Sequence, residues 1–206
     1  MEEYRTVLEE SEAVFTERRS RFICRSKPVQ SEEEALGFLH AVRTACWDAN
    51  HNVFAYCLRA GGIKRFSDDG EPQGTAGMPV LDVLQKSGVT DAAVVVTRYF
   101  GGILLGAGGL VRAYSHGASL ALEQAKIIVM RSCLCCSLQC EYGEYGKISA
   151  LLPENGGTVD HAEFTDTVEV LFHMVPENLP EFEKKLADVT RGTCRVKTSE
   201  VKYFKI

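Results

Sequence analysis

The chain has 206 residues, of which 45% are hydrophobic and 25% charged, so it holds enough apolar material for one or two small domains and is not a globally disordered protein. Its formal net charge of −5 is spread over both halves, with 14 Lys+Arg against 16 Asp+Glu in residues 1–130 and 9 against 12 in residues 131–206. Neither half is a basic module, which disfavours DNA as a partner and leaves room only for a local basic patch.

The N-terminal segment does not have the composition of a targeting signal. Residues 1–15 are acidic where a secretory signal is basic, and they lack a continuous apolar stretch. Further along, Arg98 interrupts the most apolar region, so no run reaches the roughly 18 apolar residues that a membrane span requires. We therefore expect a soluble, cytoplasmic protein without a membrane partner.

The first predicted helix has a clear start signal. Ser31 and Glu34 form a capping-box pattern, and the apolar residues that follow at helical spacing predict a helix over about 32–46. The flanking segments 21–29 and 53–59 are rich in β-branched and aromatic residues, and we predict a strand in each.

The next elements surround two unusual segments. After a turn indicated by Asp69-Gly70, Thr75 is predicted to cap a helix that ends near residue 85. Residues 92–100 are predicted to form a buried central strand, and small residues on one face of 107–125 predict a helix that lies close to a sheet.

From about residue 131 the pattern changes and predicts a second domain. Its expected elements are a strand (133–141), a helix (143–152), two strands joined near Thr165-Asp166, a helix (179–189) and a strand (195–204). This order, βαββαβ, is the ferredoxin-like plan. We therefore predict an α+β protein with domains at residues 1–130 and 131–206.

The eight cysteines are predicted to be reduced, because they lack the spacing of a small secreted disulfide scaffold. Four of them cluster in one predicted strand, at Cys133, Cys135, Cys136 and Cys140. Their spacing matches neither paired CxxC motifs nor a Cys/His zinc pattern, and alternation places Cys133 and Cys135 on one face. The cluster therefore indicates packing rather than metal binding.

A glycine-rich loop after Arg98 is the first candidate site. Its glycines are Gly101, Gly102, Gly106, Gly108 and Gly109. A guanidinium beside a glycine loop and a helix N-terminus could bind a phosphate through its planar donors and the free backbone N–H groups. Alternatively, the glycines only allow the helix to pack on the sheet, and Arg98 pairs with Asp68, Asp69 or Glu71.

The acidic turn that carries Asp68, Asp69 and Glu71 is the second candidate site. Three carboxylates in four residues could hold Mg²⁺, and the alternative is a solvated turn; no other cofactor is expected. His51 and Thr75 are assigned to the same candidate ligand surface, although His51 could instead be a hydrogen-bonded structural histidine. No nucleophile is apparent, so no catalytic residue is assigned.

Two long motifs resemble those of the Impact family of conserved proteins. They are RFSDDGEPQGTAGMPVL (65–81) and VVVTRYFGGILLGAGGLVRAY (94–114), supported by SRFI (20–23), DANHNVFAY (48–56) and CEYGEYGKI (140–148). The resemblance covers nearly the whole chain, and the two-domain form resembles the bacterial members.

The resemblance implies a fold and a function. The N-terminal domain is expected to be similar to the second domain of a small-subunit ribosomal protein, with a left-handed βαβ crossover. The C-terminal domain is expected to be similar to the last domain of elongation factor G. Because both relatives handle RNA or work on ribosomes, the resemblance implies a noncatalytic RNA- or ribosome-associated protein, with a role in translation regulation.

Two alternatives stay open. The N-terminal fold type also hosts kinases with a glycine-rich loop at a helix start, which would make the protein an enzyme acting on a phosphorylated small molecule, although GAGGL departs from their serine-containing loop. Eukaryotic Impact proteins are translational regulators that compete with a starvation-responsive kinase for its activating partner. That precedent would make the protein an interaction module with a protein partner, and exposed Tyr99, Phe100 or Trp47 would support it.

Overall fold

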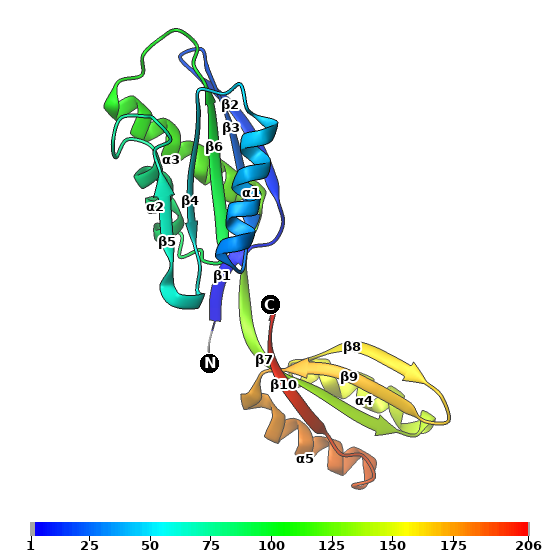
Figure 1. Ribbon diagram of the computed structural model, residues 1–206. Coiled ribbons are helices and arrows are strands. Elements are labelled where there is room, and N and C mark those ends of the chain that lie inside the picture. Colours follow the sequence, from blue (N-terminus) through cyan, green and yellow to red (C-terminus); the bar gives the residue numbers. More distant parts are fainter. Residues whose placement is uncertain (1–2, 206) are drawn as a thin grey trace. The chain divides into compact units, whose positions relative to one another are not determined.

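The computed structural model describes residues 3–205, which divide into two compact units (Figure 1). Residues 4–129 form the N-terminal unit, and residues 130–205 together with Glu3 form the C-terminal unit. Within residues 3–205, no helix combines the length and the apolar character needed to cross a membrane.

The N-terminal unit is built on an antiparallel sheet with the strand order β2-β3-β6-β4-β5. The strands of this sheet are β2 (Ser11–Glu17), β3 (Ser20–Pro28), β4 (His51–Cys57), β5 (Lys64–Ser67) and β6 (Ala92–Tyr99), and β1 (Glu3–Val7) is not part of it. The helices of the unit are α1 (Glu32–Ala45), α2 (Gly77–Lys86), α3 (Ala107–Gln124) and the short 3₁₀ turn η1 (Ala60–Gly62). The predicted strand over 92–100 is therefore confirmed as the centre of the sheet.

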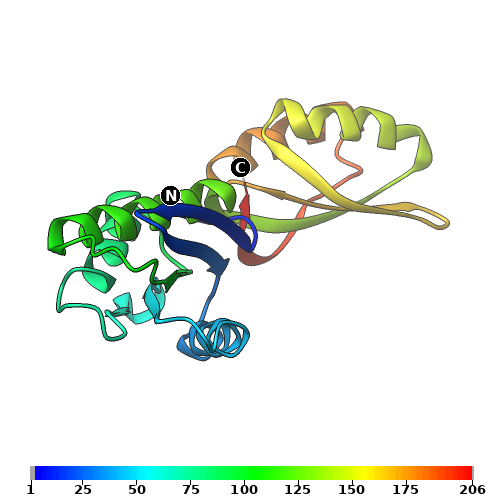
Figure 2. The ribbon, with the colours of Figure 1, turned by 90° about the horizontal axis from the view of Figure 1, so that it is seen from above.

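The helices of the N-terminal unit cover both faces of this sheet (Figures 1 and 2). Alternate residues of β6 divide between two cores: Val94 and Val96 pack with α2 and α3, whereas Ala93 and Val95 pack with α1. Tyr114 of α3 is fully buried against the sheet, with its ring edge-on to Phe22 of β3 at 5.6 Å between ring centroids.

The unit contains two crossover connections of opposite hand. The connection β3-α1-β4 and the connection β5-α2-β6 each skip one strand of the sheet. They start from oppositely directed strands, run in opposite directions across the sheet and use opposite faces. Three reversals invert the hand, so one of the two crossovers is left-handed, against the strong general preference for right-handed connections.

The start of α1 is as predicted, and the start of α2 is not. The side-chain oxygen of Ser31 accepts a hydrogen bond from the Glu34 N–H at 3.1 Å, and the Glu34 carboxylate accepts one from the Gln30 N–H at 2.7 Å. Thr75 was expected to cap α2, but its hydroxyl donates to the Pro72 carbonyl and no side chain of the N-cap residue Ala76 caps the helix.

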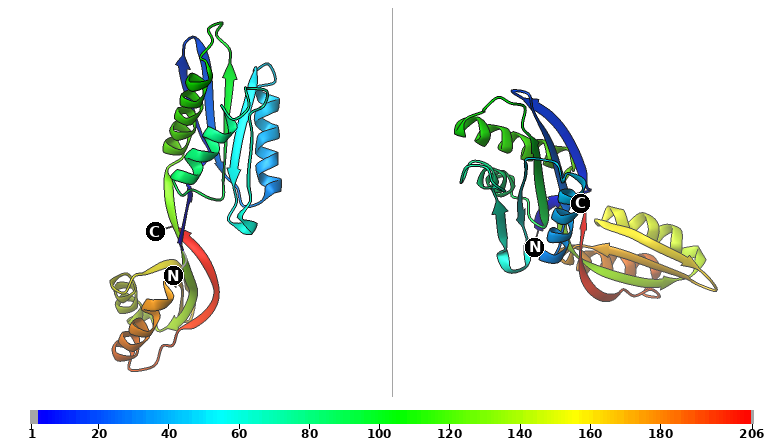
Figure 3. Two further views of the ribbon diagram at one scale, coloured as in Figure 1. Left: turned by 90° about the vertical axis from the view of Figure 1, so that its left-hand side faces the viewer. Right: turned by 45° about the horizontal axis from the view of Figure 1, so that its top comes forward.

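The C-terminal unit has the predicted βαββαβ plan. Its elements are β7 (Ile127–Cys140), α4 (Tyr142–Glu154), β8 (Gly157–Phe164), β9 (Val168–Met174), η2 (Pro176–Asn178), α5 (Leu179–Thr190) and β10 (Lys197–Lys205). Antiparallel pairing gives the order β10-β7-β9-β8, which is the ferredoxin-like arrangement, and α4 and α5 lie on one face (Figure 3). Ile148, Leu152, Phe172 and Phe182 fill the core between the helices and the sheet.

All eight cysteines have free thiols, as predicted. Cys136 and Cys140 pack in the core beneath α4 and α5, so alternation turns Cys133 and Cys135 to the other face of β7. Burial raises the pKa of the Cys24 thiol to about 12 and that of Cys136 to about 11. These thiols therefore stay protonated near neutral pH and serve as apolar packing groups.

Candidate functional site

Arg98, near the end of β6, lies in a buried polar cluster with Glu71 and Tyr114. The Arg98 Nη1 donates to the Glu71 Oε1 at 2.7 Å, and the Tyr114 hydroxyl donates to the same oxygen at 2.7 Å. Nη2 donates to the Ser20 hydroxyl at 3.3 Å. Both charged side chains are almost fully buried, so of the two interpretations of Arg98 the internal ion pair with Glu71 is present. Burial and the Glu71 carboxylate raise the pKa of Tyr114, which keeps its hydroxyl protonated as a donor.

His51 lies beside this cluster because of the strand register. On neighbouring strands, Phe22 and His51 both pair with Arg98, so the three side chains lie on the face of the sheet that α2 and α3 cover. The His51 Nδ1 is 2.9 Å from the Asp69 carbonyl oxygen, which can only accept, so this nitrogen carries the proton. The Nε2 lies 3.8 Å from the Glu71 Oε1. His51 therefore connects the acidic turn to the buried cluster.

The carboxylates of the acidic turn are directed to separate partners. Asp68 accepts hydrogen bonds from the N–H groups that precede and begin α2, and Asp69 accepts from the Asn52 N–H at 2.6 Å and from Arg43 at 2.9 Å. Glu71 faces Arg98. Among residues 3–205 no three His, Cys, Asp or Glu side chains gather as a metal site, so these three carboxylates do not converge, and Mg²⁺ binding by the turn stays a prediction.

Asp68 is the cap that the sequence analysis missed. Its Oδ1 accepts from the N–H groups of Ala76 (3.1 Å) and Gly77 (2.8 Å), and its Oδ2 accepts from Gly74 (2.9 Å). The carboxylate thus satisfies free donors at the α2 N-terminus and also opposes the positive end of the helix dipole. Aspartate is a common capping residue, but Asp68 lies nine residues before the start of α2 at Gly77 rather than next to it.

Replacing Asp68 with Ala is expected to lower the free energy of unfolding by about 1–2 kcal/mol, because the N-terminal N–H groups of α2 lose their acceptor. Urea unfolding followed by circular dichroism measures this loss. Asp68→Asn keeps the acceptor oxygen without the charge and should lose less. Equal stability of the Ala variant and the original protein would contradict the assignment of Asp68 as the cap.

The five glycines of the predicted site serve different purposes. A Cβ on Gly101 would overlap the backbone carbonyl of Arg19, so this glycine permits a close approach of two loops. Gly102 and Gly106 have φ of +82° and +74°, where side chains are disfavoured. Gly108 and Gly109 lie in the first turn of α3. Of the five, Gly106 alone is among the described residues that line the cavity beside Arg98, so the structure does not gather all of them at one site.

A cavity of about 380 Å³, the α3 cavity, opens at the start of α3. Its polar lining is Asn50, His51, Glu71 and Arg98, and its other lining residues are Pro72, Phe100, Leu104, Leu105, Gly106, Ala107 and Leu110. Arg98, His51 and Gly106 of the predicted ligand surface therefore meet here, whereas Thr75 lies outside this lining. The cavity combines buried charge with an apolar wall, as small-molecule sites generally do.

The β6-α3 loop (residues 100–106) is held by its neighbours. The Phe100 N–H donates to the Asn50 side chain at 2.8 Å, the Gly101 N–H to the Ser20 hydroxyl at 3.3 Å, and Arg18 to the Leu104 carbonyl at 3.3 Å. These bonds fix the loop between the β2-β3 turn and the segment before β4. A second cavity of about 430 Å³ is lined in part by Arg18 and Leu105.

Two arginines form the β2-β3 turn, and sequence reasoning missed their significance. Glu17 pairs with Ser20, so Arg18 and Arg19 are a two-residue hairpin loop, and their φ angles are +46° and +66°. Positive φ at both positions defines the type I′ turn, which Asn-Gly normally occupies. The only signal in the sequence was the pair of adjacent arginines itself, because strand β2, which precedes them, was not predicted.

Exposed apolar side chains stand at the same end of the unit. Trp47 is 83% exposed, Leu104 is 79% exposed and Phe100 is 45% exposed. Trp47 directly precedes Asp48, whose carboxylate accepts a hydrogen bond from the Tyr99 hydroxyl at 3.0 Å, next to Phe100. The loop end, defined as the β2-β3 turn, residues 46–50 and the β6-α3 loop, thus combines exposed aromatic rings with cationic side chains.

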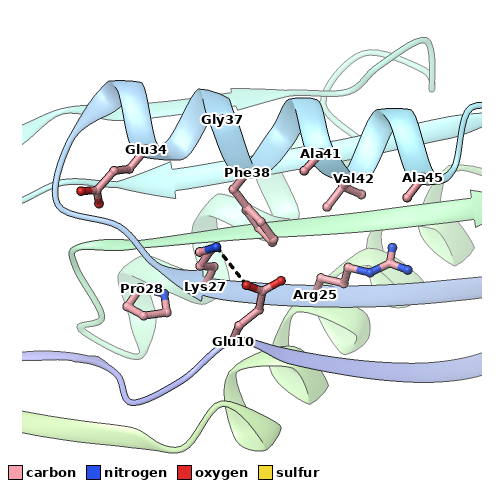
Figure 4. Close-up of a pocket in the computed structure, with 10 residues that line it drawn as sticks. All are labelled: Glu10, Arg25, Lys27, Pro28, Glu34, Gly37, Phe38, Ala41, Val42 and Ala45. Carbon is pink, nitrogen blue, oxygen red and sulfur yellow. Dashed lines mark ion pairs between the residues drawn. The ribbon is translucent and has the colours of Figure 1, made fainter.

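A further groove lies along α1 and contains none of the predicted residues. Figure 4 shows Phe38 and Val42 of α1 facing Arg25 and Lys27 of β3 across it. Lys27 pairs with Glu10 at 3.0 Å, drawn as the dashed line, and Arg25 pairs with Glu12 at 2.8 Å. The cations of this groove are therefore already paired with Glu12 of β2 and with Glu10, which precedes that strand.

Comparison with known proteins covers both units. The Impact N-terminal domain matches residues 18–122, and a domain of unknown function (DUF1949) matches residues 138–193. The Impact family member YvyE of Bacillus subtilis is 35% identical over 98% of this chain and 93% of its own. The Impact family member YigZ of Escherichia coli is 38% identical over 87% and 89%. The crystal structure of a hypothetical protein is 36% identical and covers 97% of this chain and 98% of its own, with a TM-score of 0.62.

Proposed function

Because this chain belongs to the Impact family, we propose that it is a noncatalytic RNA-binding protein that associates with RNA or ribosomes through the loop end of its N-terminal unit. The observation that carries the proposal is the pair of arginines in the β2-β3 turn, beside exposed aromatic rings. A role in translation regulation would follow from binding at the ribosome.

The backbone of Arg18 and Arg19 is strained, and neither side chain is buried in the core. A residue with a Cβ in the left-handed region costs roughly 1–2 kcal/mol. Both side chains are exposed, and the hydrogen bond from Arg18 to the Leu104 carbonyl is long at 3.3 Å. Residues held in sparsely populated backbone conformations cluster at functional sites. Two guanidiniums displayed at a tight turn are suited to phosphate oxygens, which they bind bidentately.

The exposed rings supply the second element of single-stranded RNA recognition. Trp47 and Phe100 offer faces on which bases can stack, and stacking of this kind contributes about 1–3 kcal/mol per base. Proteins that bind single strands combine such rings with cationic side chains along the backbone path. The hydrogen bonds that hold the β6-α3 loop keep Phe100 in place before binding, which reduces the entropic cost of association.

Replacing Arg18-Arg19 with Asn-Gly tests the proposal with two opposite effects. The variant should be more stable by about 1–2 kcal/mol, because Asn-Gly fits the type I′ turn without strain. Its affinity for single-stranded RNA should fall, and the slope of log affinity against log salt should decrease by about 1.4, since two phosphate contacts are lost. Fluorescence polarisation with a labelled RNA across a salt series and urea unfolding measure the two effects.

The matched control removes two charges from β5, next to the end of β4 opposite His51. Lys64→Gln with Arg65→Gln changes exposed residues of β5, where Arg65 pairs with Tyr56, and should leave the salt slope unchanged. RNA binding no tighter than that of an unrelated acidic protein, or an Asn-Gly variant with the original affinity and slope, would contradict the proposal. Recovery of a single protein partner whose binding depends on Trp47 but not on salt would favour an interaction module instead.

A further inference from the structure

The α3 cavity has an uncapped helix N-terminus at one side. The helix is 18 residues long and begins after Gly106, and no side chain of its cap residue satisfies the first turn. The first intrahelical bond at this end runs from the Leu110 N–H to the Gly106 carbonyl, so the N–H groups of Ala107, Gly108 and Gly109 precede it. The absence of a Cβ at Gly106 and Gly108 leaves this backbone open. Such a terminus attracts anions through its free donors and its dipole.

An independent feature of the cavity lining also indicates a ligand. Arg98 is only 5% exposed, and its Nε is the buried side-chain nitrogen or oxygen of the described residues that has no hydrogen-bond partner. An orphaned guanidinium N–H in a buried site costs more than a satisfied one, and native structures rarely keep one without a reason. Arg98 lines the same cavity as Gly106 and Ala107, so the Arg98 side chain and the first residue of α3 border one space.

The charge balance of the cavity permits an anion. The Glu71 carboxylate is neutralised by Arg98 at 2.7 Å and accepts the Tyr114 hydroxyl as well. His51 donates from Nδ1 to the Asp69 carbonyl, and its Nε2 lies 3.8 Å from the Glu71 Oε1. The Arg98-Glu71 pair carries no net charge, and the helix N-terminus gives the cavity its attraction for anions.

The apolar lining of the α3 cavity indicates the size and the chemistry of the rest of the ligand. Phe100, Leu104, Leu105 and Leu110 form an apolar side, and the volume of about 380 Å³ is at the small end of the range for ligand pockets. Inorganic phosphate would leave this wall uncovered. A nucleotide would place its phosphate at the polar end and its base against Phe100.

We propose that the α3 cavity binds a phosphomonoester on a nucleotide-sized body, with the phosphate between the first N–H groups of α3 and the Arg98 guanidinium. The phosphomonoester could be the 5′-phosphate of an RNA strand or a free nucleoside monophosphate, and the chemistry of recognition is the same. The cavity goes beyond the RNA-binding proposal, because neither Arg18 nor Trp47 contributes to its polar end.

The variant Ala107→Pro tests the site without breaking the helix. Proline is favoured at the first helical position and has no N–H, so α3 keeps its start and loses one donor to the phosphate. Adenosine 5′-monophosphate, adenosine and inorganic phosphate are titrated by calorimetry against both proteins. The original protein should bind the monophosphate more tightly than phosphate, and adenosine least. Ala107→Pro should weaken monophosphate binding about tenfold, the effect of one hydrogen bond to a charged group.

RNA oligomers of one sequence, with a 5′-phosphate or a 5′-hydroxyl, form the second arm. If the protein prefers the phosphorylated strand and Ala107→Pro loses that preference, the ligand is an RNA end. If Ala107→Pro weakens binding of free adenosine 5′-monophosphate only, the ligand is a small molecule. Gly37→Ala, on α1 with open space around the new Cβ, is the control and should change nothing. The proposal is overturned if no phosphorylated probe binds at millimolar concentration, or if binding is the same in Ala107→Pro, whose folding a thermal melt verifies.

These outcomes separate the two proposals. If both RNAs bind equally and depend on Arg18-Arg19, and adenosine 5′-monophosphate either does not bind or binds equally to Ala107→Pro, the RNA surface stands and the phosphate site fails. If the monophosphate binds and responds to Ala107→Pro while neither RNA binds, the phosphate site stands and the RNA surface fails.

Discussion

Replacing Arg98 with Met is expected to lower the free energy of unfolding by about 3–5 kcal/mol, because it leaves the buried Glu71 carboxylate without its cation. Glu71 is 8% exposed, so water does not replace the lost donor readily. Tyr114 would still donate to it, but one neutral hydrogen bond does not compensate a buried charge. Urea unfolding at neutral pH measures the loss.

The control for this prediction is an ion pair at the surface. Lys126 pairs with Glu9 at 2.7 Å, and both side chains are more than half exposed. Lys126→Met should therefore cost no more than about 1 kcal/mol. The double variant Arg98→Met with Glu71→Gln removes both charges and should recover part of the stability lost in Arg98→Met. If Arg98→Met lowers the free energy of unfolding no more than Lys126→Met does, the buried Arg98-Glu71 pair does not stabilise the fold more than a surface ion pair.

Gly101→Ala is expected to cost about 3 kcal/mol, because its Cβ would overlap the backbone of Arg19 and Ser20. Backbone cannot rotate away as a flexible side chain can, so the β2-β3 turn or the β6-α3 loop has to move. Such movement would also break the hydrogen bond from the Gly101 N–H to the Ser20 hydroxyl. Urea unfolding and the RNA titration should therefore both report a loss.

The neighbouring glycine provides a matched comparison. Gly102 has a φ of +82° with nothing within 4 Å of a built Cβ, so Gly102→Ala introduces backbone strain alone and should cost only about 1–2 kcal/mol. Equal losses in the two variants would mean that conformational strain, and not the close approach of two loops, explains the glycines of this segment.

Local signals in the sequence predicted much of the fold. The capping box at Ser31 and Glu34 placed the start of α1 correctly, because both hydrogen bonds join residues that are neighbours in the chain. The apolar run at 92–100 predicted the central strand β6, and the alternation of the C-terminal half predicted its βαββαβ order. Strands β1, β2 and β5 were not predicted, because they are short or exposed and lack a distinct apolar pattern.

Local sequence signals did not predict the contacts of the candidate site. Thr75 was the nearest polar residue before α2 and was predicted to cap it, but Asp68 reaches its N–H groups across a folded turn. Three carboxylates close together in the chain indicated one metal site, yet each binds a different partner. Arg98 could have met a ligand or a carboxylate, and the sequence did not distinguish them.

For this protein, composition and periodicity were enough to predict the class of fold and the order of the main elements. These depend on how apolar residues repeat along a few turns or strands, which the chain carries locally. The contacts of Arg98 depend on Glu71, Ser20 and Tyr114, and these residues meet it only through strand register and the position of α3. Side chains far apart in the chain become neighbours only when the sheet and its helices pack, so the cluster, the strained arginine turn and the α3 cavity appeared with the folded structure.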